Sequence, residues 1–256
     1  MTENAPKSDG AAGAAGETPV MPLFYTQPEV LRKDAHANLG LKKQGNYLFT
    51  KDANAVPITV SEFPMASIHY PIIFVGEERK TPVAVLSYER GKNFFVNNEG
   101  KWEDTAYIPA YVRRYPFVFM RDDANNRFAL CIDRGSELIA EADDSDTVQP
   151  FFKDGEETEL TQNALQFCTA YQQEANATEQ FVQILQKHNL IETRSANLTL
   201  KDGQTATINN IGVVDEQKVN DLSDEAFLDL RKTGALGVLY CHLISQKAWQ
   251  PLIIRG

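Results

Sequence analysis

Cysteine and histidine are scarce in this sequence, and their scarcity excludes several kinds of chemistry. The three cysteines, Cys131, Cys168 and Cys241, lie far apart in apolar surroundings and form no C-x-x-C pair. An odd number of distant cysteines is typical neither of a disulfide framework nor of a zinc site. We therefore expect three buried, reduced thiols in a reducing compartment, with a catalytic cysteine as the alternative. The four histidines show no metal-ligand spacing, so no metal is expected.

Basic residues are also in short supply. The chain has 25 Lys and Arg against 35 Asp and Glu, which gives a formal net charge of −10. Proteins that bind nucleic acid need a basic surface to displace the counterions of the phosphates. No run of three basic residues occurs in the sequence. We therefore expect neither a nucleic-acid partner nor an anionic membrane surface.

Long apolar runs are missing as well. No stretch approaches the roughly 20 apolar residues that span a bilayer, and the N-terminus lacks the basic and apolar regions of a secretion signal. These features predict a cytoplasmic protein without a membrane span. The dinucleotide, P-loop, zincin and serine-hydrolase signatures are absent too. No cofactor is therefore expected.

The residues that are present predict an α+β protein of ordinary globular composition, with 43% hydrophobic residues. Residues 1–20 are mostly Ala, Gly and small polar residues, which predict a disordered tail. Short strands separated by Gly and Asn turns predict a mainly antiparallel β-rich N-terminal portion over residues 21–150. Residues 151–256 are predicted to be a helix-rich C-terminal portion with a β-hairpin. The two portions could equally form one continuous domain.

Individual elements follow from periodicity and from turn residues. A hairpin is predicted at Asp202-Gly203, with strands over 196–200 and 204–208. A helix is predicted over 160–171, and a second from Asn176, where the spacing resembles a capping box. Further strands are predicted over 56–60, 72–75, 81–88, 91–96 and 128–133.

The last two predicted helices have clear boundaries. Ser223 is expected to begin one helix as its N-cap, and Gly234 is expected to end it. The final helix follows and carries apolar residues at helical spacing: Leu236, Leu239, Tyr240, Leu243 and Ile244.

Arginines and aromatic residues gather between Trp102 and Asp133. In an extended strand, alternation would place Arg113 on the aromatic side and Arg114 on the opposite side. We therefore predict that Arg113 is buried and structural, paired with Asp133 or Glu62. Arg114 is predicted to face a groove and to bind an anionic group. The aromatic residues of this stretch are Tyr107, Tyr111, Tyr115, Phe117 and Phe119.

Two other sites carry polar residues that can do chemistry. Glu62 and His69 flank one connection and could form a general acid–base pair, although structural hydrogen bonding is the simpler interpretation. His36 is either a surface or capping residue or a ligand. No catalytic residue can be assigned. The candidate ligand-binding set is Arg114, Arg113, Trp102, Tyr107, Glu62, His69 and His36.

Several segments carry a family resemblance: V-P-I-T-V-S-E-F, H-Y-P-I-I-F, G-K-N-F-F-V, Y-I-P-A-Y-V-R-R-Y-P-F, V-V-D-E-Q-K and L-G-V-L-Y-C-H-L-I-S. In their residues and in their order along the chain, these segments resemble the SapC family of bacterial proteins, over roughly residues 22–254. The resemblance implies an association with surface-layer genes, with outer-membrane receptors and with flavin-dependent halogenase-like proteins. It assigns no catalytic residues.

These observations lead to two competing functional hypotheses. The first is a non-catalytic cytoplasmic binding or accessory protein of a bacterial cell-surface or nutrient-uptake system, with a protein partner or a small anionic ligand. The second is an enzyme or enzyme subunit of a peptide- or nutrient-modifying system with an Arg/aromatic pocket. A structural role in a surface layer ranks last. An enzyme needs polar groups that converge in a deep pocket, whereas an accessory protein needs an exposed apolar patch.

Overall fold

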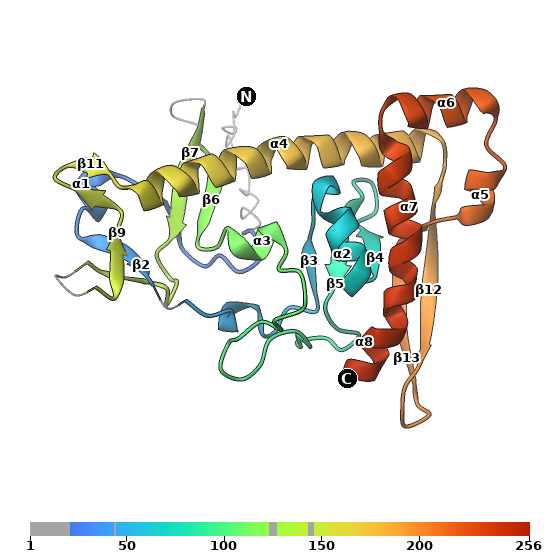
Figure 1. Cartoon of the computed structure of the whole chain (residues 1–256), viewed down its shortest axis with the longest axis horizontal. Coiled ribbons are helices and arrows are strands. Elements are labelled where there is room, and N and C mark those ends of the chain that lie inside the picture. The colour runs from blue at the N-terminus through green and yellow to red at the C-terminus, as the bar shows by residue number, and fades with distance from the viewer. Residues whose placement is uncertain (1–20, 44, 123–126, 143–145) are drawn as a thin grey trace, which may run out of the picture.

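The computed structural model describes residues 21–43, 45–122, 127–142 and 146–256. The chain has the predicted α+β class, with antiparallel sheets mainly in the N-terminal part and most helices in the C-terminal part (Figure 1). The predicted tail, residues 1–20, lies outside the described residues. None of the described helices has the length and apolarity needed to cross a membrane.

A five-stranded antiparallel sheet lies at one end of the molecule (Figure 1). It takes strands from both sides of residue 150. The pairing of β13 with β4 is limited to Gly212 and Phe74, so the far end of the β12–β13 hairpin extends away from the sheet. In spatial order the strands are β12 (Ile191–Thr199), β13 (Thr205–Val214), β4 (Ile72–Val75), β5 (Thr81–Val85) and β3 (Ala55–Pro57).

Smaller antiparallel sheets form the other end of the molecule. Gly40 is central to one of them, because a Cβ at this position would lie 2.2 Å from the carbonyl oxygen of Gln149. The described strands, sheet by sheet, are β1 (Pro28–Val30), β7 (Arg127–Asp133) and β6 (Phe117–Asp122); β8 (Ile139–Glu141), β2 (Leu39–Lys42) and β9 (Val148–Pro150); and β10 (Phe152–Lys153) with β11 (Glu156–Glu157).

Helices cover and connect these sheets. The α-helices are α1 (Lys33–His36), α2 (Phe63–His69), α3 (Ala110–Arg113), α4 (Glu159–Lys187), α5 (Glu216–Asn220), α6 (Asp224–Lys232), α7 (Ala235–Ser245) and α8 (Trp249–Arg255). Short 3-10 helices are η1 (Leu48–Thr50), η2 (Val60–Glu62) and η3 (Gln246–Ala248). Helix α4 has 29 residues and, at about 1.5 Å per residue, is roughly 44 Å long. It extends from the smaller sheets at one end of the molecule to the five-stranded sheet at the other (Figure 1).

Helix α4 corrects the prediction of two separate helices. Asn176 lies in the middle of α4 and caps nothing. The segment contains neither Gly nor Pro. It is rich in Ala, Gln, Glu and Leu, which are good helix formers. Nothing in the local sequence therefore ends the helix, and the capping-box spacing at Asn176 was misleading.

Two hydrophobic cores depend on α4. Phe181, Val182 and Leu185 pack into the larger core, around the five-stranded sheet. Cys168 packs into the smaller core with Phe117 and residues of the other end. One continuous helix therefore contributes side chains to both cores.

None of the three cysteines forms a disulfide bond. Cys131 and Cys168 are buried as predicted, whereas Cys241 is half-buried. Burial raises the pKa of Cys168 to about 11 and raises that of Cys241 as well. Both thiols therefore stay protonated near neutral pH, which disfavours the catalytic-cysteine alternative for these two positions.

Other predicted elements can be compared directly with the fold. Strand β4, the β12–β13 hairpin and the helix capped by Ser223 are confirmed. The strand predicted over 91–96 is wrong, because this segment forms turns with one isolated bridge between Val96 and Trp102. Helix α2 had no counterpart among the predictions.

The strand predicted through Arg113 and Arg114 is also wrong. Residues Ala110–Arg113 form the short helix α3, and β6 begins only at Phe117. Pro109 precedes α3 with a φ of −56°, which suits the start of a helix. The Ala110 amide donates to the Glu62 carboxylate at 2.6 Å, and this tertiary contact holds the first turn in place.

Candidate functional site

Glu62 is a buried carboxylate, 5% exposed, and it joins two segments of the chain. Its Oε2 accepts hydrogen bonds from the Thr59 amide at 2.8 Å and the Thr59 hydroxyl at 3.0 Å. Its Oε1 accepts from the Ala110 amide at 2.6 Å and the Tyr107 hydroxyl at 3.0 Å. Burial and the neighbouring Glu62 raise the pKa of Tyr107, so this phenol keeps its proton and donates. Glu62 thus ties η2 to α3.

The proposed Glu62–His69 acid–base pair does not form. Glu62 precedes α2 and His69 ends it, so about 10 Å of helix separates them. His69 is half-buried with its ring centroid 6.0 Å from that of Tyr70. Burial and the nearby Arg255 lower the pKa of His69. The unpredicted helix α2 is the physical reason that the pair is absent.

Arg113 was expected to be buried, but its side chain is exposed. Its Nε donates to the carbonyl oxygen of Ile108 at 3.0 Å, and a terminal nitrogen donates to the Tyr107 hydroxyl at 3.2 Å. The guanidinium lies 5.7 Å from the Tyr107 ring centroid and 5.4 Å from that of Phe167. Through Tyr107, Arg113 is connected to Glu62.

Arg114 is the arginine that packs among aromatic rings. Its guanidinium lies 4.2 Å from the Tyr111 centroid, 4.4 Å from the Tyr171 centroid and 5.8 Å from the Tyr25 centroid. Its Nε is buried and has no hydrogen-bond partner among the described residues. Burial by itself would lower the pKa of Arg114, but the tyrosines, with Tyr25 foremost, hold it above its ordinary value.

The predicted placement of the two arginines is therefore reversed. Consecutive residues of a helix point about 100° apart, not to opposite sides as in a strand, so α3 turns Arg114 inward and leaves Arg113 outside. Asp133 and Glu62, the carboxylates predicted to pair with Arg113, instead accept hydrogen bonds from other groups. Asp133 accepts from the Tyr115 hydroxyl at 2.9 Å and from the Gln27 amide at 2.7 Å.

Trp102 and His36 lie apart from the arginines. Trp102 is buried against Tyr47 and Phe95, and its Nε1 has no hydrogen-bond partner in the described part of the chain. His36 is buried in α1 with its Nε2 3.3 Å from a Glu29 oxygen. Within the described ranges, neither residue forms a hydrogen bond, ion pair or ring contact with Arg113 or Arg114. The structure thus joins Glu62, Tyr107 and Arg113 and leaves the others separate.

The described residues also contain no group of His, Cys, Asp and Glu arranged to hold a metal ion. What they do contain is an exposed apolar surface. Helices α2 and α7 pack side by side, and four large apolar side chains point outward from them. The exposed fractions are 52% for Met65 and 65% for Ile68 on α2, and 47% for Tyr240 and 60% for Ile244 on α7. We call these four residues the α2–α7 surface.

A small apolar groove opens beside the start of α7. It has a volume of about 280 Å³ and lies between α7, η2 and one flank of α4. Val60, Phe181, Ile184 and Val238 contribute its apolar walls. Such a groove can receive one large side chain from a partner, which is how interface anchors bind.

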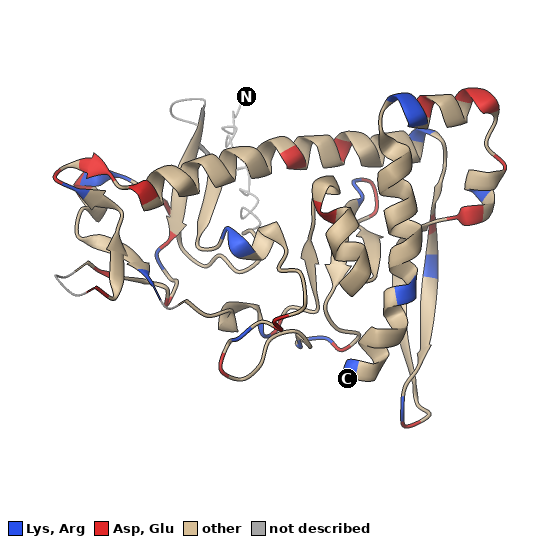
Figure 2. Ribbon diagram, viewed as in Figure 1, with Lys and Arg blue, Asp and Glu red and all other residues tan. Residues whose placement is uncertain are grey.

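The α2–α7 surface is uncharged, but cations border it. Neither α2 nor α7 contains Lys, Arg, Asp or Glu (Figure 2). Arg231 and Lys232 immediately precede α7, and Lys247 follows it; all three are exposed. None of the three forms an ion pair with another described residue. The surface therefore has an apolar centre with unneutralised positive charge at both ends of α7.

The exposure of Tyr240 and Ile244 was not predicted from the sequence, because helical spacing alone does not show which apolar residues of a helix face the solvent. One signal could have revealed it. Helix α7 is apolar around most of its circumference, and such helices are normally fully buried. Where such a helix keeps large apolar side chains exposed, as α7 does with Tyr240 and Ile244, an interaction surface is indicated.

Comparisons with known proteins give one family and no close relative of known function. No curated protein and no solved structure gives a significant match to the chain. The SapC family matches residues 31–252, a range that includes the Glu62 network, Arg114 and the α2–α7 surface. Because this match covers far more than half of the sequence, the chain belongs to the SapC family.

Proposed function

We propose that this protein is a non-catalytic accessory protein of a bacterial cell-surface or nutrient-uptake system, and that it holds a partner protein on its α2–α7 surface. The observation that carries the proposal is the uncharged, exposed apolar face of two packed helices. Binding a partner protein requires no reacting groups, only apolar area and complementary charge. Cysteines without disulfide bonds favour a reducing compartment, and we therefore propose that the protein acts in the cytoplasm.

The chemistry of the surface indicates the chemistry of the partner. Its apolar residues lie on two helices, α2 and α7. The groove beside α7, with a volume of about 280 Å³, can hold an anchoring side chain of the partner. An amphipathic helix presents apolar residues at matching intervals of three and four. Arg231, Lys232 and Lys247 flank α7. Acidic residues at the two ends of the partner's helix would therefore lie next to opposite charges.

The expected energetics are adequate for a specific complex. Burying a large apolar side chain contributes roughly 1.5–3 kcal/mol. Ile68 and Ile244 are the two most exposed of the four residues of the α2–α7 surface, so replacing either with Asp should weaken binding at least about tenfold. The same replacements should change the free energy of unfolding by no more than about 0.5–1 kcal/mol, because both sites are exposed.

The test uses full-length chain with a photo-crosslinking amino acid at position 68, 244 or 165. Leu165, which is 40% exposed on the far part of α4, is the matched control. In cells of the encoding bacterium, positions 68 and 244 should cross-link to the same protein and position 165 should not. The captured protein is identified by mass spectrometry, and its binding is reconstituted from purified components.

Binding between the purified components, measured with variants, then tests the proposal against its alternatives. Ile68→Asp and Ile244→Asp should abolish the complex, and Leu165→Asp should not. Lys232→Glu with Lys247→Glu should weaken it and reduce its salt dependence. A complex that survives all these changes would contradict the proposal. So would sedimentation showing that the surface instead joins two copies of this chain.

A further inference from the structure

A second, larger cleft lies on the opposite flank of α4 from the groove beside α7. It has a volume of about 500 Å³, within the range of roughly 300–1,000 Å³ that holds small ligands. One wall is the flank of α4 from Tyr171 to Gln186, and the other is formed by residues 57–59 and 78–82. The cleft therefore lies where the five-stranded sheet meets the long helix.

Much of the cleft is apolar. Ile58, Pro82 and Val182 are buried residues that line it, and the ring of Tyr171 contributes to the same wall. Such a lining stabilises the apolar body of a ligand through burial of its surface. It does not by itself select a ligand class, so the polar groups decide the specificity.

The polar groups of the cleft include several donors without partners. Lys80 is half-buried and forms no ion pair within the described ranges, whereas Arg79 is paired with Glu179 at 3.0 Å. The Tyr171 hydroxyl and the Gln183 amide also have no hydrogen-bond partner among the described residues. The remaining acid of the lining, Glu78, is exposed to solvent. A ligand with acceptor oxygens would satisfy the unpaired ammonium and phenol together.

A positive charge also lies behind the cleft wall. The guanidinium of Arg114 is 4.4 Å from the centroid of the Tyr171 ring, and the two interact electrostatically. The nearby carboxylate of Glu62 is engaged by the Thr59 and Ala110 amides and by the Tyr107 hydroxyl. Arg114 has no carboxylate partner, but the charge of Glu62 acts on Tyr171 in the opposite sense, so Lys80 is the cation on which anion binding depends.

We propose that this cleft binds a small organic anion, with its apolar body on Ile58, Pro82 and Val182 and its carboxylate or phosphate group on Lys80 and Tyr171. This inference goes beyond the partner-docking function and is independent of it, because the two sites lie on opposite flanks of α4. Its failure would leave the α2–α7 proposal intact, and the reverse also holds.

The test is a titration of the purified full-length chain, followed by backbone amide chemical shifts. The probes are phenylacetate, phenyl phosphate and phenethylamine, which share a ring and differ in charge. For probes of this size we expect dissociation constants of about 1 mM for the two anions, with shifts at Thr59, Thr81 and Thr178. Phenethylamine should bind at least about tenfold more weakly.

Variants separate the cleft from the rest of the surface. Lys80→Met keeps the side-chain stem and should weaken anion binding at least about tenfold, and Tyr171→Phe should weaken it about threefold. Thr81→Glu places a carboxylate in the cleft and should abolish binding, whereas Lys201→Met on the hairpin turn should have no effect. The proposal is overturned if the amine binds as tightly as the anions. It is equally overturned if Lys80→Met and Thr81→Glu both bind like the unaltered chain.

Discussion

Arg114 and Arg113 are adjacent in sequence and have opposite surroundings. Arg114 packs against the rings of Tyr111 and Tyr171, and Arg113 lies exposed over Tyr107 and Phe167. A guanidinium is weakly hydrated and planar, so it tolerates burial against aromatic faces better than an ammonium does. The raised pKa of Arg114 means that the cation persists in this environment.

Replacing each arginine with Ala should therefore have different consequences for stability. Arg114→Ala removes two close cation–π contacts and the packing of the side-chain stem, and should lower the free energy of unfolding by about 1–3 kcal/mol. Arg113→Ala removes exposed contacts and should cost less than about 1 kcal/mol. Urea unfolding of both variants provides the measurement. Equal losses, or a larger loss for Arg113→Ala, would contradict this assignment.

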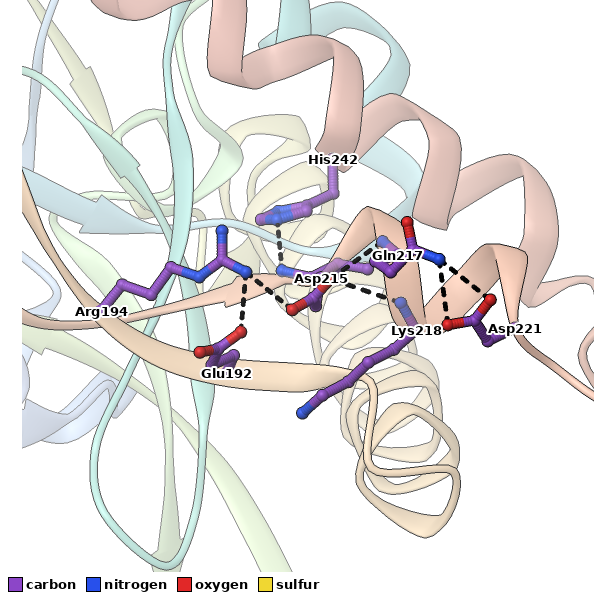
Figure 3. Close-up of polar contacts among 8 residues, drawn as sticks. Glu192, Arg194, Asp215, Gln217, Lys218, Asp221 and His242 are labelled. Atoms are coloured by element: carbon purple, nitrogen blue, oxygen red, sulfur yellow. Dashed lines mark hydrogen bonds and ion pairs between the residues drawn. The ribbon is translucent and has the colours of Figure 1, made fainter.

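His242 is fully buried, at 0% exposed, and we expect it to make the stability depend on pH. Its Nε2 accepts the Val214 amide hydrogen at 2.9 Å (Figure 3), so this nitrogen is unprotonated. Burial lowers the pKa of His242 to about 3, against about 6.5 in the unfolded chain. Below pH 6.5 the unfolded chain therefore binds a proton that the folded protein excludes.

The free energy of unfolding should accordingly fall as the pH falls. The expected slope from His242 is about 1.4 kcal/mol per pH unit, beginning below about pH 6.5 and ending near pH 3. His242→Gln removes the titrating group and should flatten the slope between pH 6.5 and pH 5, even if the variant is less stable. Urea unfolding across this pH range measures both slopes. Identical slopes would show that His242 is not the group responsible.

At the scale of elements, the junction between β13 and α5 shows how a helix start is secured (Figure 3). Asp215 is the N-cap of α5, and its Oδ1 accepts from the amides of Gln217 at 2.8 Å and Lys218 at 3.3 Å. Its Oδ2 accepts from Arg194 of β12 at 2.7 Å, and the same arginine nitrogen bonds Glu192. One side chain thus caps a helix and links it to the edge strand.

Substitutions at Asp215 should separate these two contributions. Asp215→Ala removes the cap and the ion pair and should cost about 1–2 kcal/mol. Asp215→Asn keeps a capping oxygen and loses a partly exposed ion pair, so it should cost less than about 1 kcal/mol. Asp221→Ala, which removes only contacts to the Gln217 side chain, is the control and should be near neutral. The unfolding free energy in urea measures the series, and a loss for Asp221→Ala as large as for Asp215→Ala would refute it.

At the scale of the whole molecule, long-range contacts join the N-terminal and C-terminal parts of the chain. The five-stranded sheet contains β3, β4 and β5 from one part and β12 and β13 from the other. Phe181, Val182 and Leu185 of α4 complete the larger core. A division of the chain near residue 150 would expose this apolar surface to water.

A fragment of residues 21–150 tests that division. It lacks α4, β12, β13 and α7, and we expect it to show no cooperative unfolding transition in urea, because its core is incomplete. The chain of residues 21–256 should unfold cooperatively and serves as the control. A sharp transition in the fragment would instead support an independent N-terminal domain.

The sequence by itself determined the features whose causes are local. Asp202-Gly203 specified the hairpin turn, Ser223 specified the start of α6, and the apolar run Ile72–Val75 specified a buried strand. Each of these depends on the backbone preferences of a few neighbouring residues. The α+β class and the family followed from the same local patterns, summed along the chain.

Tertiary structure alone decided the rest of the candidate sites. The Ala110 amide bonds to Glu62, 48 residues away, and Tyr171 of α4 contacts Arg114 from across the fold. Alternation within Trp102–Asp133 could not reveal that α3 is helical, nor which arginine turns inward. Periodicity likewise identified the apolar residues of α7, but not which of them remain exposed. Burial depends on which elements pack together, and that depends on contacts between residues far apart in the chain.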